Sequence, residues 1–234
     1  MKVKGSVVLV TGANRGLGLE FAKQALARGA AKVYATARDP SKITLAGVVP
    51  LRLDVTNAAE AAAVAEQCKD LTLLINNAGI ARLGGVVEGD PAPLLREQLE
   101  TNLFGMLHVS RAFAKILGKN GGGAILNILS IVSWVNTPMI GGYGITKAAA
   151  WGLTNSLRHE LRAQGTQVVS FHAGFIDTDL TRGLDIPKAR PEDVVRQSYD
   201  AIEAGQEEVM TDEPTRQVKS ALSQGVYLND VLAG

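Results

Sequence analysis

The chain has 234 residues, a length that allows one domain or two small ones. Hydrophobic residues make up 46% and charged residues 20%, a balance typical of folded globular proteins that excludes a disordered chain. The 24 basic and 23 acidic residues leave a formal net charge of +1, which argues against a nucleic-acid or anionic-membrane surface, because both need a basic excess.

The cysteine content and the apolar stretches bear on where the protein works. Cys68 is the single cysteine and cannot form an intramolecular disulfide. No uninterrupted apolar stretch reaches the roughly 18 residues that a membrane span needs. The apolar run near the N-terminus is too short for a signal peptide, and a glycine-rich turn follows it. We therefore expect a cytoplasmic protein with no membrane contact.

Short apolar runs alternate with longer helical stretches along the chain. The runs predicted as strands are Ser6–Val10, Lys32–Thr36, Val48–Leu53, Leu71–Asn76, Ala124–Ser130, Gln167–Phe171 and Glu208–Thr211. The stretches predicted as helices are Leu17–Arg28, Ala58–Cys68, Pro93–Leu117, Lys147–Ala163 and Pro191–Ala204. Such alternation predicts an α/β fold: one Rossmann-type doubly wound parallel sheet of about seven strands, with helices on both faces. No linker divides the chain, so residues 1–234 are expected to form a single domain.

A glycine-rich segment joins the first predicted strand to the first helix. It reads Thr11-Gly12-Ala13-Asn14-Arg15-Gly16-Leu17-Gly18, and its G-x-x-x-G-x-G spacing differs from the G-x-G-x-x-G fingerprint. Glycines at such a turn expose backbone N–H groups beside the positive end of the helix dipole, which suits a pyrophosphate. The alternative is an ordinary tight turn. The strand and helix on either side favour cofactor binding.

Two arginines bear on the choice between NAD and NADP. Arg38 follows the second strand, where an arginine accommodates the 2′-phosphate and an acidic residue binds the 2′-hydroxyl. Arg15 lies in the glycine-rich turn and can bind the same phosphate. The neighbouring acidic residue Asp39 argues for NAD, although the sequence Asp39-Pro40-Ser41 is typical of a turn. The pattern favours NADP(H) over NAD(H), the alternative being two solvated surface arginines.

Five further elements, in order, give the chain a resemblance to the classical short-chain dehydrogenase/reductase family from Lys2 to about Thr178. They are Asp54-Val55, Asn76-Asn77-Ala78-Gly79, Asn102, the pair of Ser130 with Tyr143-Gly144-Ile145-Thr146-Lys147 thirteen residues later, and Ile176-Asp177-Thr178. Together with the glycine turn they are expected to bind the cofactor through Gly12, Asn14, Arg15, Gly16, Leu17, Gly18, Arg38, Asp54, Val55, Asn76, Ala78, Gly79, Tyr143, Lys147, Gly174, Ile176 and Thr178.

The resemblance implies a catalytic set of Asn102, Ser130, Tyr143 and Lys147. Tyr143 and Lys147 are four residues apart, so on a helix they share a face, and the ammonium is expected to lower the phenol pKa toward working pH. Such a phenol serves as general acid for reduction and general base for oxidation. Ser130 is expected to hold the substrate oxygen, with Ser133 as its competitor. By resemblance, Lys147 also binds the nicotinamide ribose and Asn102 holds a water. The alternative is a core tyrosine and a solvated lysine.

One position departs from the family pattern. Members usually carry Pro-Gly after the sixth strand, whereas this chain reads His172-Ala173-Gly174, which frees a backbone N–H near the nicotinamide. His108 and His159 are interpreted as helix-surface or interface residues, and His172 as a residue that could approach the site. None of the three histidines has metal-ligand spacing, so no metal site is expected.

The favoured function is NADP(H)-dependent reduction of a hydrophobic ketone or aldehyde, or its reverse. A non-catalytic dinucleotide sensor is the alternative, and the complete catalytic set argues against it. The segment 179–190 is expected to form a short lid over the small-molecule substrate. The predicted pocket lining is mostly apolar: Ile131, Ser133, Trp134, Val135, Met139, Gly174, Phe175, Leu180 and Leu184. The chain lacks the Asp-Gly-Gly-type ending of acyl-carrier-protein reductases, which counts against that substrate.

Assembly is the last expectation. The stretches Pro93–Leu117 and Lys147–Ala163 resemble the family helices that form a dimer interface. The second carries more apolar surface than one core-facing stripe needs. We therefore expect a homo-oligomer, a tetramer or a dimer.

Overall fold

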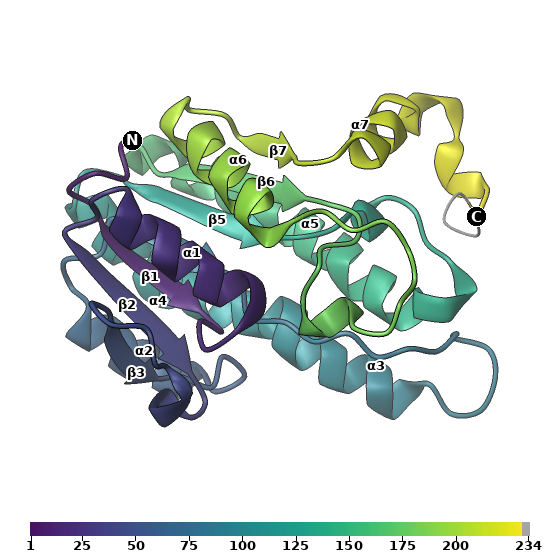
Figure 1. Ribbon diagram of the computed structural model, residues 1–234, viewed down its shortest axis with the longest axis horizontal. Coiled ribbons are helices and arrows are strands. Elements are labelled where there is room, and N and C mark those ends of the chain that lie inside the picture. Colours follow the sequence, from purple (N-terminus) through teal and green to yellow (C-terminus); the bar gives the residue numbers. More distant parts are fainter. Residues whose placement is uncertain (231–234) are drawn as a thin grey trace.

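The computed structural model describes residues 1–230 and contains one parallel sheet (Figure 1). Its strands are β1 (Val7–Thr11), β2 (Lys32–Ala37), β3 (Val49–Arg52), β4 (Leu73–Asn76), β5 (Ala124–Ile128), β6 (Gln167–His172) and β7 (Glu208–Met210). They lie in the order β3-β2-β1-β4-β5-β6-β7. The predicted doubly wound sheet is confirmed. The last four residues of the predicted domain lie outside the described residues.

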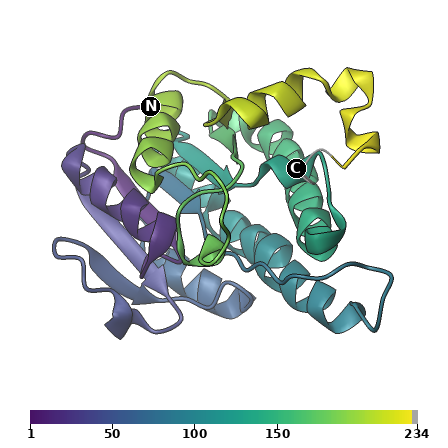
Figure 2. The ribbon, with the colours of Figure 1, turned by 45° about the vertical axis from the view of Figure 1, so that its right-hand side comes forward.

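Helices cover both faces of this sheet. They are α1 (Gly16–Ala27), α2 (Ala58–Gln67), α3 (Ala92–Leu99), α4 (Gly105–Lys119), α5 (Gly141–Leu161), α6 (Pro191–Glu203) and α7 (Glu213–Ser220). The pair α1 and α6 packs on one face, and α2, α4 and α5 lie on the other, as the two ribbon views show (Figures 1 and 2). No helix within residues 1–230 combines the length and apolar character that crossing a membrane requires.

Two apolar cores explain why the strands read as continuous hydrophobic runs. On β1, Val8 and Val10 contribute to the core beneath α1 and α6, while Leu9 contributes to the core beneath α2, α4 and α5. Both faces of a central parallel strand are therefore buried, and polar alternation is absent. Cys68 is fully buried in the second core.

The helix starts and ends differ from the prediction at three places. The single helix predicted over Pro93–Leu117 is two helices, α3 and α4, joined by a π-helical turn at Glu100–Phe104. The predicted helix Lys147–Ala163 begins earlier, at Gly141, so that α5 includes Tyr143. Helix α7 was not predicted, because its eight residues carry little apolar periodicity.

The carboxyl ends of the strands meet at one edge, where the site is expected. β1 is flanked by β2 and β4, so the chain direction across the sheet reverses at β1. In open α/β sheets ligands bind in the crevice outside this switch point. The predicted strand Ala124–Ser130 ends at Ile128, which places Ser130 in the loop beyond the edge.

Candidate active site

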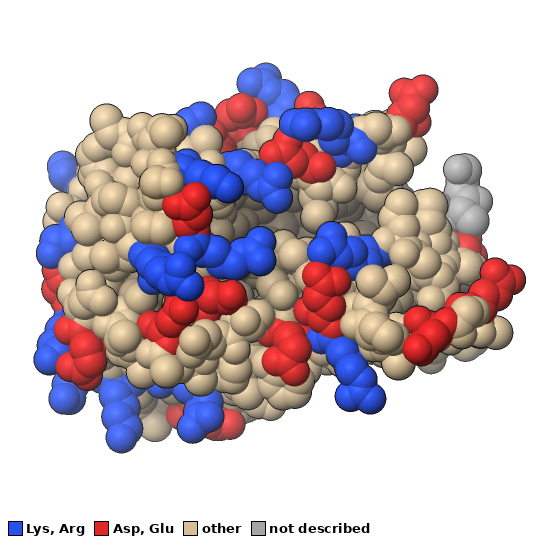
Figure 3. All heavy atoms as spheres, turned by 90° about the horizontal axis from the view of Figure 1, so that it is seen from below, with Lys and Arg blue, Asp and Glu red and all other residues tan. Residues whose placement is uncertain are grey.

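A cleft of about 900 Å³ opens at the carboxyl edge of the sheet. It is lined by the turn after β1 and by the segments that follow β2, β3, β4, β5 and β6, together with the start of α5. One face of the molecule is visibly hollowed near its centre, with charged side chains of both signs around the hollow (Figure 3). Segments distant in sequence therefore share one cavity.

The glycine-rich turn after β1 leaves space where side chains would block a ligand. Gly12 and Gly16 have φ angles of +65° and +54°, which disfavour any residue with a Cβ. A Cβ on Gly18 would lie 2.2 Å from the Gly12 carbonyl oxygen. No side chain caps the start of α1, and its first turn carries no acidic residue. Its first N–H groups and the positive end of its dipole therefore fit the pyrophosphate of a dinucleotide.

Asn77, which the sequence analysis did not single out, ties this turn to β4. Its Nδ2 donates to the Thr11 and Gly12 carbonyl oxygens at 2.8 and 3.2 Å. The Thr11 hydroxyl in turn accepts from the N–H groups of Asn77 and Ala78, both at 2.9 Å. The ends of β1 and β4 are thus fixed to each other where the cleft begins. The N-N-A-G sequence was the available signal.

Asn76 lies elsewhere than predicted. Its side chain is buried and donates to Ser110 Oγ at 3.0 Å and to Asn127 Oδ1 at 2.8 Å. The expectation that the Asn76 side chain binds the cofactor is therefore corrected: along a strand successive side chains point to opposite faces, and this one faces α4 and β5. Its neighbours Ala78 and Gly79 line the cleft.

The segments after β2 and β3 place three more of the predicted cofactor-binding residues on the cleft wall. Arg38, Asp54 and Val55 line it. Asp39 does not, because its carboxylate accepts from the N–H and hydroxyl of Ser41 at 3.1 and 2.6 Å. These hydrogen bonds hold the pKa of Asp39 below its usual value. The turn-forming interpretation of Asp39 is confirmed, which leaves Arg38 as the charged side chain after β2 that faces the cavity.

Ser130, from the loop after β5, and Tyr143 and Lys147, from α5, line the same cleft. Lys147 is almost fully buried, and its Nζ donates to the Ile128 carbonyl oxygen at 2.7 Å. The same Nζ lies 5.5 Å from the centre of the Tyr143 ring. Ser130 Oγ accepts from the Val132 N–H and donates to the Ala173 carbonyl, both at 3.3 Å. These three side chains converge because α5 begins early enough to carry Tyr143 on its first turn.

Burial determines the protonation states of Tyr143 and Lys147. It lowers the pKa of the Lys147 ammonium to about 8 and raises the pKa of the Tyr143 phenol above its usual value. The expectation that Lys147 lowers the phenol pKa is therefore corrected for this state of the protein. Desolvation disfavours the charged form of both groups, and the ammonium is bonded to a carbonyl rather than to the phenol. Tyr143 is accordingly a neutral phenol at pH 7.

Asn102 lies next to the cleft but not on its lining. It sits in the π-helical turn between α3 and α4, where its amide donates to the Ile80 carbonyl and to Thr146 Oγ, both at 2.9 Å. Its Oδ1 accepts from the Ile80 N–H at 2.8 Å. The wider helical turn lets Asn102 reach the backbone after β4, and π-turns of this kind are frequent at functional sites.

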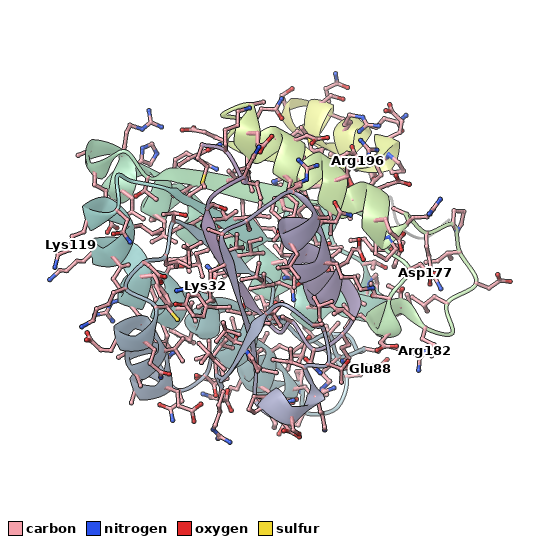
Figure 4. All side chains as sticks on the ribbon, turned by 60° about the vertical axis from the view of Figure 1, so that its left-hand side comes forward. Lys32, Glu88, Lys119, Asp177, Arg182 and Arg196 are labelled. Carbon is pink, nitrogen blue, oxygen red and sulfur yellow. The ribbon has the colours of Figure 1, made fainter. Side chains whose placement is uncertain are left out.

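The segment after β6 crosses the mouth of the cleft. Gly174, Ile176 and Thr178 line it as predicted. The Gly174 N–H donates to Asp212 Oδ2 at 2.8 Å, a carboxylate at the start of α7. Further on, Asp179 lies 3.5 Å from Arg15, which joins this segment to the glycine-rich turn. Asp177 and Arg182 extend outward from the same loop, at the side of the molecule (Figure 4).

Two of the nine residues predicted to line the substrate pocket line this cleft. Gly174 and Leu180 line the cleft, whereas the other seven candidates do not. Ile131, Trp134 and Val135 are buried with Val218 in a separate apolar cluster. Ser133 is also buried, and its hydroxyl accepts from the Ser130 N–H at 3.3 Å. The short helical turn over Ile131–Ser133 points these side chains inward, which periodicity alone could not reveal.

The three histidines lie in different environments. His159 is exposed on α5, while His108 is half-buried with Nδ1 3.3 Å from the Val55 carbonyl oxygen. His172 is fully buried behind Ser130 and does not line the cleft. Within residues 1–230 no three His, Cys, Asp or Glu side chains are grouped so as to hold a metal ion.

Comparison with known proteins agrees with this geometry. Residues 6–188 match the family model described as short chain dehydrogenase. Galactitol 2-dehydrogenase (L-tagatose-forming) from Cereibacter sphaeroides is 35% identical over 202 residues, which cover 82% of this chain and 78% of that protein. The 3-oxoacyl-(acyl-carrier-protein) reductase of Escherichia coli K12 is 33% identical over 194 residues, 79% of each chain.

A solved structure is similar over nearly the whole length. A short-chain dehydrogenase from Burkholderia cenocepacia J2315, crystallised in complex with NADP, is 37% identical with a TM-score of 0.93. The match covers 97% of this chain and 98% of that one. Family model, relatives, fold and cleft thus lead to one conclusion: the chain belongs to the short-chain dehydrogenase family of oxidoreductases.

Proposed function

We propose that the protein is an NADP(H)-dependent oxidoreductase that reduces a hydrophobic ketone or aldehyde to the alcohol, or catalyses the reverse. One observation carries the proposal: Ser130, Tyr143 and Lys147 line the same cavity as the glycine-rich turn after β1. A dinucleotide sensor would need the turn but not the three polar side chains. Their convergence with the turn therefore favours catalysis over binding alone.

The cofactor, when bound, supplies a hydride for the substrate carbonyl carbon. As negative charge develops on the carbonyl oxygen, the Ser130 hydroxyl donates a hydrogen bond to it and Tyr143 delivers the proton from its phenol. Once the proton has left, the Lys147 ammonium, 5.5 Å from the centre of the Tyr143 ring, attracts the phenolate that remains. Burial keeps Tyr143 protonated before the reaction, which suits it to the reductive direction.

The charges at the adenosine end favour NADP. Arg38 lines the cleft after β2, and Arg15 lines it from the glycine-rich turn with its side chain 72% exposed. Asp39 is engaged with Ser41, so its carboxylate does not oppose a 2′-phosphate. The NADP complex of the Burkholderia cenocepacia protein is consistent with this preference.

Apolar side chains on the proposed lid, and on two loops that adjoin cleft-lining residues in the sequence, support a hydrophobic substrate. Leu180 lines the cleft on the proposed lid and is 55% exposed. On the loop after β4, Leu83 and Val86 are exposed, as is Met139 before α5. The Gly84 N–H donates to the Met139 carbonyl at 2.8 Å, which joins the two loops. Exposed apolar groups gathered beside a polar site are typical of ligand-binding rims.

We also propose a homo-oligomer, a tetramer or a dimer, assembled through α4 and α5. Phe104, just before α4, and Ile145 on α5 are exposed by more than a third of their surface. The α5 helix adds exposed small residues at Ala148 and Gly152, which permit close helix contact. Light scattering tests this: a stable species at the monomer mass of 24.7 kDa would contradict it.

A substrate panel tests the proposed reaction. Ketones and aldehydes of increasing apolar size would be assayed with NADPH and with NADH, by following loss of the reduced nicotinamide absorbance. We expect turnover with NADPH, kcat/KM rising with apolar size, and a weaker rate with NADH. Equal kcat/KM for the two cofactors would contradict the NADP preference. A preference for small polar carbonyls would contradict the substrate class.

A further inference from the structure

His172, the last residue of β6, has a contact that the reaction proposed above does not use. Its ring is fully buried, and Nδ1 lies 3.0 Å from the main-chain carbonyl oxygen of Ser130. The His172 side chain does not line the cleft, although its hydrogen-bond partner Ser130 and its sequence neighbour Ala173 do. His172 therefore reaches the serine from behind, through the protein interior.

The partner of Nδ1 fixes the tautomer of this histidine. A carbonyl oxygen can only accept, so Nδ1 carries the proton and donates it. Burial lowers the pKa of His172 to about 4, so the ring is neutral at pH 7. Nε2 then carries a lone pair, and this nitrogen is buried without a hydrogen-bond partner, 3.7 Å from the carboxylate of Glu208. The lone pair on Nε2 and the Glu208 carboxylate are both acceptors, so no hydrogen bond forms between them. The hydrogen bond from Nδ1 to Ser130 is therefore the one that orients the ring.

Packing fixes the plane of the imidazole. The ring stacks on Trp134, with centroids 3.9 Å apart and planes 22° from parallel. Lys219 of α7 lies 4.7 Å from the centre of the Trp134 ring and pairs with Glu208 at 2.9 Å. Strand β7 and helix α7 thus brace the histidine from the side opposite to the cleft. A ring held in this way can aim its donor at one carbonyl.

That carbonyl belongs to the peptide unit that starts the turn after β5. It also accepts from the Ser133 N–H at 3.0 Å, and the Ser130 hydroxyl accepts from the Val132 N–H at 3.3 Å. The hydroxyl also donates to the Ala173 carbonyl at 3.3 Å, a long hydrogen bond that a substrate oxygen can replace. The orientation of this peptide decides where the hydroxyl points.

We propose that His172 is a positioning residue for Ser130: its Nδ1–H holds the Ser130 carbonyl and thereby aims the serine hydroxyl at the substrate oxygen. The inference rests on the role of Ser130 in the proposed function. It assigns His172 no contact with substrate or cofactor. Removal of the donor should lower kcat and leave the KM for NADPH unchanged, because the glycine-rich turn and Arg38 are not involved.

Variants at position 172 separate the hydrogen bond from the packing. His172→Asn retains a donor close to the place of Nδ1, while His172→Leu removes it. Both lose the stack on Trp134, so both should lower the melting temperature. We expect kcat to fall about tenfold or more in His172→Leu, the size of one lost hydrogen bond to a buried carbonyl, and to recover in His172→Asn. His159→Leu, on the exposed face of α5, is the matched control and should keep wild-type kcat.

Nitrogen chemical shifts of ¹⁵N-labelled histidine give a readout that does not depend on turnover. Wild-type protein at pH 7 should show His172 protonated on Nδ1 and bare on Nε2. A proton on Nε2, or equal loss of kcat in the Asn and Leu variants, would overturn the inference. If His172→Leu does not fold, His172→Phe replaces it, since it keeps a flat ring against Trp134 without the donor.

Ser130→Ala distinguishes failure of the inference from failure of the proposed function. Wild-type turnover in Ser130→Ala would reject the role of the serine, and the positioning role with it. Loss of turnover in Ser130→Ala together with equal kcat in the two His172 variants would reject the positioning role alone.

Discussion

The two halves of the cleft are built differently. The phosphate half, from the glycine-rich turn to Arg38, offers a ligand backbone N–H groups and arginines that are exposed or line the cavity. The catalytic half offers three side chains that are buried or half-buried, from β5 and α5, with the segment after β6 beside them. The first half needs space and positive charge. The second half needs exact placement of individual atoms, and its side chains are accordingly held by hydrogen bonds to main-chain carbonyls.

This difference predicts which changes alter turnover and which alter cofactor binding. Substitutions in the catalytic half should lower kcat or change stability, whereas those in the phosphate half should change cofactor affinity. The predictions below run from the largest expected effect to the smallest, and each one tests that division.

Tyr143→Phe removes the proposed proton donor and keeps the ring. We expect kcat to fall by about 10²–10⁴-fold, the usual contribution of general acid catalysis. NADPH affinity, measured by titration calorimetry, should change little. Tyr227→Phe makes the same change on an exposed tyrosine and should have wild-type kinetics. If Tyr143→Phe lost cofactor affinity but kept kcat, the two halves would not be separable.

Lys147 should make stability depend on pH in the cofactor-free protein. The unfolded lysine keeps its proton up to about 10.5, whereas the folded one releases it near 8. Between these values the unfolded state binds more protons at this lysine, so the contribution of Lys147 to the free energy of unfolding should rise with pH from 8 toward 10. The full difference corresponds to about 3 kcal/mol.

Urea unfolding across that range measures this rise. Lys147→Met should lack it and be more stable than wild type at pH 7, since no buried ammonium remains. Lys119→Met, on an exposed lysine at the end of α4, should retain the rise. Burial raises the pKa of the Cys68 thiol to about 12, so this thiol opposes the rise above pH 9, and the test is the interval between pH 8 and 9. A pH-independent wild type in that interval would show that burial of Lys147 costs nothing. Because the pKa of Tyr143 is raised, its effect opposes this rise only above pH 10.

Arg38→Asp tests the charge at the adenosine end. NADPH should bind more weakly and NADH more tightly, each by about 1–3 kcal/mol, the range for charged hydrogen bonds. The kcat with saturating cofactor should stay close to wild type. Lys119→Asp makes the same change in net charge away from the cleft and should not alter the preference. An unchanged cofactor ratio in Arg38→Asp would contradict the assignment of Arg38 to the 2′-phosphate.

Gly18→Ala tests the space in the phosphate half. The new Cβ would lie 2.2 Å from the Gly12 carbonyl oxygen, so the turn must shift. We expect a cost of about 1–3 kcal/mol in stability and weaker NADPH binding. Gly16→Ala is the comparison, because its Cβ meets only Thr178, at 3.8 Å, and its cost comes from φ alone, about 1–2 kcal/mol. Equal cofactor affinity in Gly18→Ala and wild type would show that close backbone approach is not required.

The sequence alone determined the sheet, the glycine-rich turn and most of the cleft wall. Strand runs such as Ser6–Val10 are apolar on both faces because helices cover both, and that pattern is local. The glycine-rich turn and Arg38 could also be predicted, because each directly follows a strand and therefore lies at the carboxyl edge of the sheet. Ser130, Tyr143 and Lys147 were identified by their resemblance to the family motif, and the fold keeps them together because β5 leads into α5.

Tertiary structure alone decided the direction of individual side chains. Asn76 turns into the core and Asn77 ties β1 to β4, although the two residues are adjacent. The phenol pKa rises because burial outweighs a lysine whose ammonium is bonded to Ile128. His172 meets Ser130 across 42 residues of sequence. Such contacts depend on which face of an element packs against which neighbour, and that is settled by the packing of the whole chain rather than by any local pattern.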